Sequence, residues 1–438
     1  MIKKLTISIF IFLLSASDQI PGSIQQNPIL LKGGVIHTVS SGDFIDADIL
    51  FQNGKIIEIG YNLDLENGTE IIDLNGNHVY PGLISGISTL GLQEIGAVRA
   101  TRDYAEVGDI NPNVRSNVSY NPDSELIPIT RSNGVLIALS VPRSGSVSGR
   151  SSLMMLDGWT WEDATLKNSV GLHVFWPSMD VLKDHSDPTK NKKKSESILK
   201  SIQVFDDLLE RSRAYLKLKE AKSKSFKHDL RLESMLPVIK KNIPIFIHAN
   251  EVKQIESAIY WSDRQNIDMI LVGGRDSWRT INLLKDRKIP VIYTKTHSVP
   301  SRRYEHYDQA FLTPFQLYQS GIKFCISNSE SPFQTPHIRN LPYHAAKAAS
   351  YGLPWEEALR SITLSVAEIL GVDEKVGSLE VGKDATLFIS NGDILEIPSV
   401  VKRAYIQGRL VDLGDRHKTL NKKYRKKYQQ QKMQSLGK

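Results

Sequence analysis

The sequence predicts an α/β protein: a (β/α)₈ TIM-like barrel plus a small composite β-sandwich formed by both chain ends. Two observations carry this prediction. Continuous apolar runs alternate with helical stretches in the middle of the chain, and both ends are rich in β-forming residues punctuated by turn signals. A length of 438 residues suits one large barrel with an accessory unit.

The two ends supply the sandwich strands. Residues 29–80 hold β-rich runs separated by pairs such as Asn53-Gly54 and Asn75-Gly76, and Asn-Gly between apolar runs is a strong hairpin signal. Residues 377–413 repeat this texture. We therefore assign 18–80 and 374–414 to the two parts of one sandwich.

The middle, residues 81–373, supplies the barrel. Its apolar runs are continuous rather than alternating, which indicates strands buried on both faces. Strands that alternate with helices predict parallel pairing with right-handed crossovers. The clearest strand runs are 134–141, 243–249, 267–274, 289–294 and 322–327, and the clearest helical stretches are 251–265, 276–287 and 309–320.

The N-terminus has the pattern of a secretory signal peptide. Two lysines precede a short apolar run, and small residues follow up to Ser17. That run is too short to span a bilayer comfortably. We expect removal of residues 1–17 and export to the periplasm or the exterior. The single cysteine, Cys325, excludes an internal disulfide and a cysteine-based zinc cluster.

Positive charge is concentrated at the C-terminus. The tail, residues 415–438, holds nine Lys and Arg and one Asp. Its net charge therefore exceeds the +7 of the whole chain. The remainder is slightly acidic, so we expect no nucleic-acid partner. A Lys- and Ser-rich stretch at 182–230 predicts a solvated insertion that leads into a helix. The tail predicts a disordered or fraying basic helix, with an anionic membrane surface or an acidic protein as candidate contacts.

Two motifs carry a resemblance to a known family. Pro81-Gly-Leu-Ile84 follows the N-terminal hairpins, and Gly377-Ser-Leu-Glu-Val-Gly-Lys-Asp-Ala385 stands near the other end. With the segment 363–371, these resemble the amidohydrolase superfamily, most closely its imidazolonepropionase-like branch. The resemblance covers roughly 29–413. It implies a distorted barrel with a composite sandwich and metal-dependent hydrolysis of non-peptide C–N bonds, often in cyclic amides.

The metal ligands implied by the resemblance are mostly replaced. The family places His-x-His after the first strand, where this chain has Ile87 and Thr89. Of the later ligands, His248 matches the strand-five histidine, but Gly273 stands at the strand-six position and Ser329 at the strand-eight aspartate. Since a catalytic zinc usually has three protein ligands, we expect neither zinc nor another divalent metal as cofactor.

Polar residues remain at the expected barrel mouth. Arginine pairs suit carboxylates because the guanidinium donates two parallel hydrogen bonds; the alternative for Arg302 and Arg303 is a surface ion pair with Glu305 or Asp308. The small-residue run 145–152 predicts a loop, either a plain tight turn or an anion site. The candidate substrate-binding residues are His248, Arg275, His297, Arg302, Arg303 and Glu330.

Three functions stay open. The first is a pseudoenzyme or supporting subunit, in a hetero-oligomer with a metal-competent relative or in a homo-oligomer. The second is an active hydrolase with a rebuilt mononuclear site from His248, His297 and Glu330. The third is a periplasmic protein that binds a small carboxylate or cyclic amide.

Overall fold

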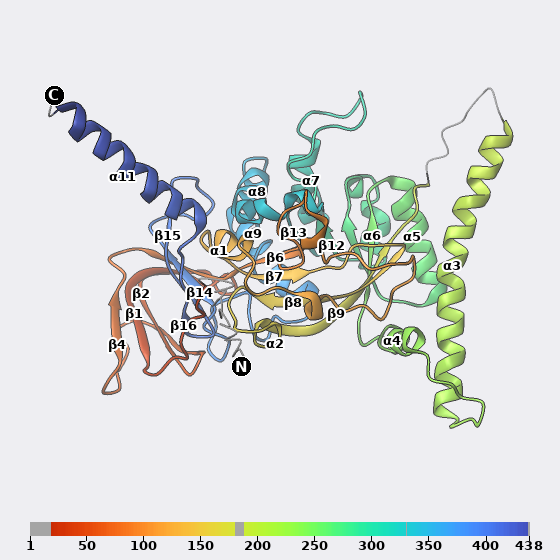
Figure 1. The fold of residues 1–438 in the computed structure, drawn as a ribbon, viewed down its shortest axis with the longest axis horizontal. Helices are drawn as coiled ribbons and strands as arrows, with labels where there is room; N and C mark the ends of the chain where they lie inside the picture. The colour runs from red at the N-terminus through yellow and green to blue at the C-terminus, as the bar shows by residue number, and fades with distance from the viewer. Residues whose placement is uncertain (1–18, 180–187, 330, 437–438) are drawn as a thin grey trace, which may run out of the picture.

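The computed structural model describes residues 19–179, 188–329 and 331–436 and contains two eight-stranded sheets (Figure 1). One sheet forms a nearly closed barrel and the other forms a separate domain beside it. The predicted fold class, a TIM-like barrel with an added sheet domain, is confirmed. The expected signal peptide, residues 1–17, and Glu330 lie outside the described residues.

Both chain ends build the accessory sheet. Strand β5 pairs antiparallel with β14, so that Pro81 lies opposite Leu387 and His78 opposite Ser390. The sheet encloses its own apolar core, which includes Phe51 from the N-terminal part. Its strands are β1 (Ile29–His37), β2 (Asp43–Gln52), β3 (Lys55–Gly60), β4 (Glu70–Asp73), β5 (His78–Pro81), β14 (Leu387–Ser390), β15 (Val401–Ile406) and β16 (Arg409–Leu410).

The barrel sheet runs in sequence order from β6 to β13. Alternate side chains fill its interior, because successive residues of a strand point to opposite faces. Ile84, Ile137, Phe246, Ile292 and Cys325 share one buried apolar cluster. The strands are β6 (Leu83–Ser88), β7 (Val135–Ser140), β8 (Val147–Met155), β9 (Thr165–Phe175), β10 (Ile245–Ala249), β11 (Met269–Gly273), β12 (Val291–Tyr293) and β13 (Phe324–Ile326).

Strand β8 departs from the expected pattern. It runs antiparallel to both β7 and β9, whereas the other neighbouring pairs are parallel. The loop prediction for 145–152 is therefore wrong from Val147 onward. Small polar residues are accommodated in this strand because their hydroxyls bond to backbone carbonyls: Ser148 donates to Ser144 and Ser151 to Gly171.

Helices surround the barrel, and the three predicted helical stretches are confirmed in α5, in η3 with α6, and in α7. The α-helices are α1 (Leu126–Arg131), α2 (Trp161–Ala164), α3 (Pro188–Glu220), α4 (Leu230–Ile239), α5 (Val252–Gln265), α6 (Ile281–Asp286), α7 (Gln309–Gln319), α8 (Leu341–Ala349), α9 (Trp355–Arg360), α10 (Leu364–Leu370) and α11 (Arg416–Leu436). The 3₁₀ helices are η1 (Arg99–Thr101), η2 (Ser116–Ser119), η3 (Ser277–Arg279) and η4 (Pro332–Asn340).

Two long helices extend from the body in Figure 1. The described part of the Lys- and Ser-rich insertion contains α3, which packs on the barrel through Phe205 and Trp261, while the Trp261 indole donates to Asp206 at 2.8 Å. The basic tail is helical as α11. Within the described residues, no helix is both long and apolar enough to cross a membrane.

The β5–β14 pairing generates the first prediction. A chain shortened to residues 18–376 lacks β14, β15 and β16, so it exposes the edge of β5 and the apolar core of the accessory sheet. We expect this chain to aggregate, as measured by light scattering of purified protein. A control ending at residue 415 lacks only α11 and the last residues, and it should stay soluble and unfold cooperatively. A soluble, cooperatively unfolding 18–376 chain would contradict the shared sheet.

Candidate functional site

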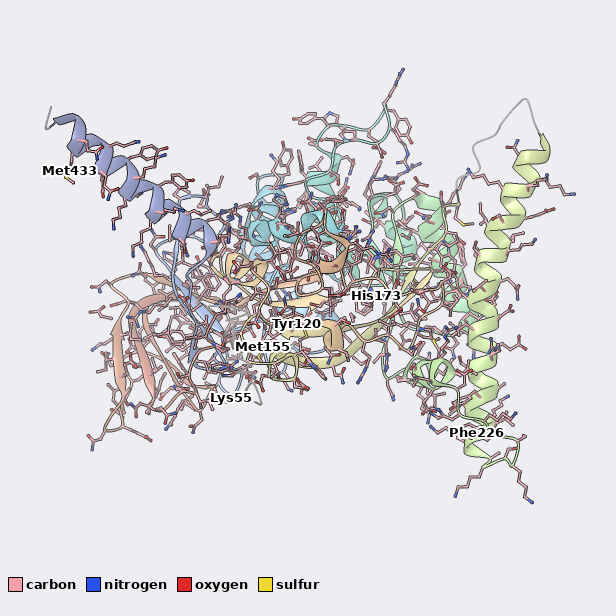
Figure 2. All side chains as sticks on the ribbon, in the orientation of Figure 1. Lys55, Tyr120, Met155, His173, Phe226 and Met433 are labelled. Atoms are coloured by element: carbon pink, nitrogen blue, oxygen red, sulfur yellow. The ribbon has the colours of Figure 1, made fainter. Side chains whose placement is uncertain are left out.

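The barrel mouth is the place to look for chemistry, because active sites of such barrels lie at the C-terminal ends of the strands. His248, on β10, points into the barrel two residues after Phe246. His173, on β9 and labelled in Figure 2, lies opposite Phe246 in the strand register. It therefore shares this face. The two histidines are joined by a hydrogen bond of 2.9 Å between His173 Nδ1 and His248 Nε2, and both are buried.

Aromatic rings hold this histidine pair in place. Phe175 stacks on His248 with ring centroids 4.0 Å apart, and Phe246 stacks on His173 at 4.7 Å. The Arg143 guanidinium lies 5.2 Å from the centre of the Phe175 ring. Sequence reasoning missed the pairing of His173 with His248. The signal that could have found it is strand parity, since a parallel register places both residues inside the barrel.

The residues at the His-x-His positions, Ile87 and Thr89, pack against and hydrogen-bond to neighbouring residues. Ile87 is 2% exposed and belongs to the apolar cluster inside the barrel. Its backbone N–H donates to Ser327 Oγ at 3.1 Å. The Thr89 hydroxyl is hydrogen-bonded to the Thr335 hydroxyl at 2.6 Å, and both are buried. The end of strand β6 is thus attached to β13 and to η4, which follows it.

A side chain at the strand-six position would collide with Asn250. Gly273 has φ +100°, a conformation that L side chains rarely adopt. A Cβ there would lie 2.6 Å from Asn250 Oδ1 and 3.1 Å from the Ala249 carbonyl oxygen. A histidine at this position would therefore require Asn250 to move. At the strand-eight position, the Ser329 hydroxyl accepts from the N–H of Ser331 at 3.3 Å.

These residues do not fit the metal centre that the family implies. Isoleucine and glycine carry no ligand atom, and Thr89 is already hydrogen-bonded. In the parts of the chain that the structure describes, no group of three or more His, Cys, Asp and Glu residues could hold a metal ion. The family's ligand positions therefore offer no set of side chains for metal-assisted hydrolysis.

His297 lies in a second histidine pair. Its ring stacks on His344 of α8, with centroids 4.1 Å apart. The Asn328 side-chain amide is 3.4 Å from His344 Nε2 and donates to the His337 carbonyl at 3.1 Å. Burial, with a smaller effect of His297, lowers the pKa of His344 to about 3. Both imidazoles of this pair favour the neutral form, since burial and then Lys347 lower the pKa of His297 as well.

The arginine candidates lie in an ion-pair network. Both terminal nitrogens of Arg302 donate to the Asp276 carboxylate, at 3.0 and 2.6 Å, and Asp276 is only 1% exposed. Arg302 also pairs with Glu305, one of the two predicted ion-pair partners. Arg275 pairs with Glu251 at 3.1 Å.

In this ion-pair network, the neighbouring opposite charges stabilise the charged forms of Arg302 and Glu305. The pKa of Arg302 is raised, chiefly by its hydrogen bonds to Asp276. Burial opposes ionisation of Glu305, but hydrogen bonds from Ser301 and Arg302 outweigh it and hold the pKa of Glu305 below its usual value. Arg303 is exposed beside this network. The structure thus places His248, His297 and the Arg275–Arg302 network in three separate sets of contacts.

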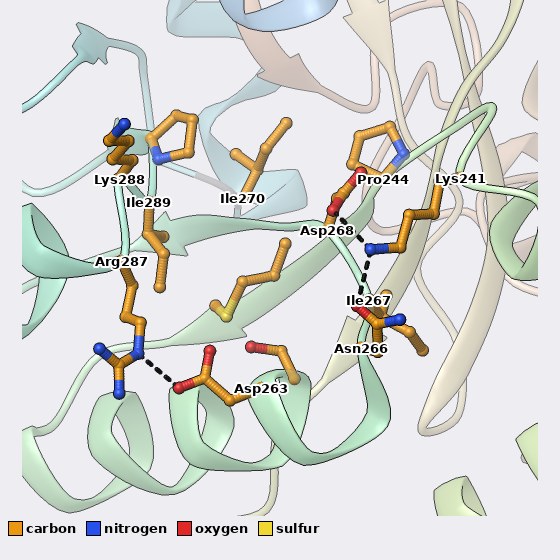
Figure 3. A pocket seen from close by; sticks show the side chains of 13 residues that line it. Lys241, Pro244, Asp263, Asn266, Ile267, Asp268, Ile270, Arg287, Lys288 and Ile289 are labelled. Atoms are coloured by element: carbon orange, nitrogen blue, oxygen red, sulfur yellow. Dashed lines mark hydrogen bonds and ion pairs between the residues drawn. The ribbon is translucent and has the colours of Figure 1, made fainter.

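One well-defined cavity lies at the opposite end of the barrel. It has a volume of about 600 Å³ and opens where Lys241, Asp268 and Ile289 lie, at the N-terminal ends of β10, β11 and β12 (Figure 3). Its charged groups pair with each other: Arg287 donates to Asp263 at 2.6 Å, and Lys241 lies 3.7 Å from Asp268. In barrels of this kind, that end serves stability rather than chemistry.

Known proteins place this architecture in one class. A family model described as "Amidohydrolase family" matches residues 327–411. The crystal structure of an amidohydrolase from Thermotoga maritima matches 88% of this chain and 99% of its own, with a TM-score of 0.77 and 26% identity. A prolidase complexed with N-methylphosphonate-L-proline shares the fold at a TM-score of 0.54 and 14% identity, covering 88% of this chain and all of its own.

Two relatives match short stretches of the chain, and a third matches most of it at low identity. The D-hydantoinase of Geobacillus stearothermophilus is 44% identical over 81 residues, or 18% of this chain, and the imidazolonepropionase of Thermoplasma volcanium is 32% identical over 111, or 24% of this chain. Amidohydrolase tasK of Hapsidospora irregularis is 20% identical over 421 residues, 82% of this chain. The chain spans 16%, 27% and 39% of the lengths of these three relatives, respectively. The family model, the imidazolonepropionase relative and the Thermotoga structure together support the amidohydrolase superfamily for this chain.

The stabilities of two glycine-to-alanine variants test whether a side chain fits at the strand-six position. Gly273→Ala should lower the free energy of unfolding by about 1–3 kcal/mol more than Gly68→Ala, measured by urea denaturation. Both glycines have strongly positive φ, +100° and +90°, but a Cβ at Gly68 meets nothing within 4 Å. The control therefore measures the backbone strain alone. Equal losses in the two variants would show that position 273 has room for a side chain.

The buried His344 predicts a pH dependence. Its pKa of about 3 in the folded chain lies below the usual 6.5, so only the unfolded chain takes up a proton between those values. Stability from this group is present above pH 6.5 and is lost as the pH falls. We expect wild type to lose about 1 kcal/mol from this histidine between pH 7 and 5.5, and His344→Asn to remove that loss.

Urea denaturation at the two pH values measures the difference. The control is His417→Asn, because His417 is exposed on α11 and should leave the wild-type loss intact. A His344→Asn variant that loses as much stability as wild type would show that His344 is not held neutral.

Proposed function

We propose that this chain is a non-hydrolytic member of its superfamily, a pseudoenzyme that supports a metal-competent relative. One observation carries the proposal: the positions of the lost ligands are used by the packing. Ile87 lies in the barrel core, Thr89 is hydrogen-bonded to Thr335, and a side chain at Gly273 would collide with Asn250. Restoring a ligand there would disrupt contacts that stabilise the mouth.

Exposed apolar side chains at the rim of the mouth support a partner subunit. Val299, Tyr304 and Phe333 are 82%, 72% and 80% exposed, and Tyr307 is exposed beside them in sequence. Val299, Tyr304 and Tyr307 lie between β12 and α7, and Phe333 lies in η4, which follows β13. Exposed apolar side chains that form a contiguous patch are typical of protein–protein contact sites. A barrel relative with an intact metal site is the partner class we propose, and a second copy of this chain is the competing one.

The rebuilt mononuclear site is less favoured. It requires His248, His297 and Glu330 to reach one ion. His248 Nε2 faces His173 at 2.9 Å, while His297 stacks on His344. Both arrangements would have to change before the two imidazoles could share a metal.

A periplasmic carboxylate binder is also less favoured. The fork of Arg302 is engaged by Asp276, so a ligand carboxylate would have to displace a buried one. Such an exchange would take a bidentate partner away from a buried carboxylate, which opposes ligand binding. Only exposed Arg303 would remain for the ligand, with Arg275 held by Glu251. Export itself rests on the expected signal peptide.

Metal analysis tests the proposal directly. We expect dialysed protein to carry well under one equivalent of zinc, manganese or iron by mass spectrometry. A chelator should leave its melting temperature unchanged, because no metal is linked to folding. Cyclic amides of the hydantoin and dihydroorotate types should not be hydrolysed, with the Geobacillus D-hydantoinase as assay control. Stoichiometric metal that is lost on His248→Ala would overturn the proposal and favour the rebuilt site.

A further inference from the structure

Over most of its length, helix α11 does not pack against the rest of the described chain. It begins after Asp415, whose carboxylate accepts the N–H of Lys418 at 2.9 Å and caps the first turn. Every side chain from 416 to 434 is exposed. The helix projects away from the body in Figure 1, and Met433 lies near its free end in Figure 2. A helix held only at its first turn contributes little to the fold and is free to meet another surface.

The charge of α11 has one sign. Its sequence contains eight Lys and Arg residues and neither Asp nor Glu. This charge exceeds the net +7 of the whole chain, so the positive charge resides on the helix while the body is not basic. A partner for this helix must be anionic. The basic residues are Arg416, Lys418, Lys422, Lys423, Arg425, Lys426, Lys427 and Lys432.

One stripe of the helix carries no cation. Leu420, Tyr424 and Tyr428 stand four residues apart and therefore share one face. All three are exposed, and the Lys427 ammonium lies 5.8 and 5.9 Å from the centres of the two tyrosine rings. The stripe thus combines amphipathic rings with a flanking cation. Tyrosine suits a boundary between apolar and aqueous surroundings, because its ring is apolar and its hydroxyl is polar.

We propose that α11 docks the protein on an anionic phospholipid bilayer. Basic segments are attracted to anionic headgroups, and the tyrosine stripe can lie at headgroup level with lysines on both sides. The stripe holds only one aliphatic residue, Leu420, so docking is electrostatic and reversible rather than by deep insertion. At about 1.5 Å per residue, the helix offers roughly 30 Å of contact along the surface.

A bilayer fits these observations better than a nucleic acid. Proteins that read a nucleic-acid sequence aim polar side chains at base edges. Here the stripe between the cations of the projecting helix holds Leu420 and two tyrosines. The proposal is independent of whether the barrel hydrolyses anything.

Vesicle co-sedimentation tests the proposal with the full chain. We expect binding to phosphatidylcholine vesicles that contain phosphatidylglycerol, none to pure phosphatidylcholine, and loss of binding at about 0.5 M salt because of screening. The variant Lys422→Gln, Lys423→Gln, Lys426→Gln, Lys427→Gln should bind at least about tenfold more weakly. It should keep the wild-type melting temperature, since these side chains do not pack on the body.

The matched control removes the same charge from α3. Lys192→Gln, Lys193→Gln, Lys194→Gln, Lys200→Gln neutralises four exposed lysines at the start of that helix and should change vesicle binding less than twofold. Equal weakening by both variants would reduce the effect to net charge and overturn the docking role of α11. Binding to neutral vesicles as strong as to anionic ones would also overturn it. So would preferential binding of duplex DNA when DNA and anionic vesicles compete at equal phosphate concentration.

Discussion

The hydrogen bonds that attach the end of β6 to the neighbouring strand and loop constrain the whole barrel mouth. The Ile87 N–H donates to Ser327 Oγ, and the hydroxyls of Thr89 and Thr335 bond to each other. These contacts join the first and the last barrel strand and draw η4 over the end of β6. The same contacts occupy the backbone and side chains at two of the positions where the family places its metal ligands.

Much of the fold could be predicted because it depends on local signals. Continuous apolar runs identify β10 to β13, and the motifs at the two ends indicate that distant segments share one domain. Strand β8 was not predicted as a strand because its serines and glycine are typical of a loop. The serine hydroxyls donate to backbone carbonyls, for example Ser152 to Asn168. These hydrogen bonds exist only once the sheet has formed.

The site was harder to predict because its contacts join distant parts of the chain. Glu305 was foreseen as a partner of Arg302, since three residues separate them. Asp276 was not foreseen in this role, although it takes both terminal nitrogens of Arg302 from another loop. Likewise, the His173–His248 bond depends on the register of β9 and β10. The residue types at the ligand positions could be read from the sequence. The cost of a side chain at Gly273 depends on its backbone angle and on Asn250, which only the structure shows.

The barrel mouth is thus a packed junction with apolar groups on its rim. Anomalous diffraction at the zinc absorption edge, from crystals equilibrated with zinc, tests that claim most directly. We predict no anomalous peak inside the mouth, with His173 and His248 still bonded to each other and Thr89 to Thr335. A peak coordinated by His248, with the His173 bond broken, would contradict a packed, metal-free mouth.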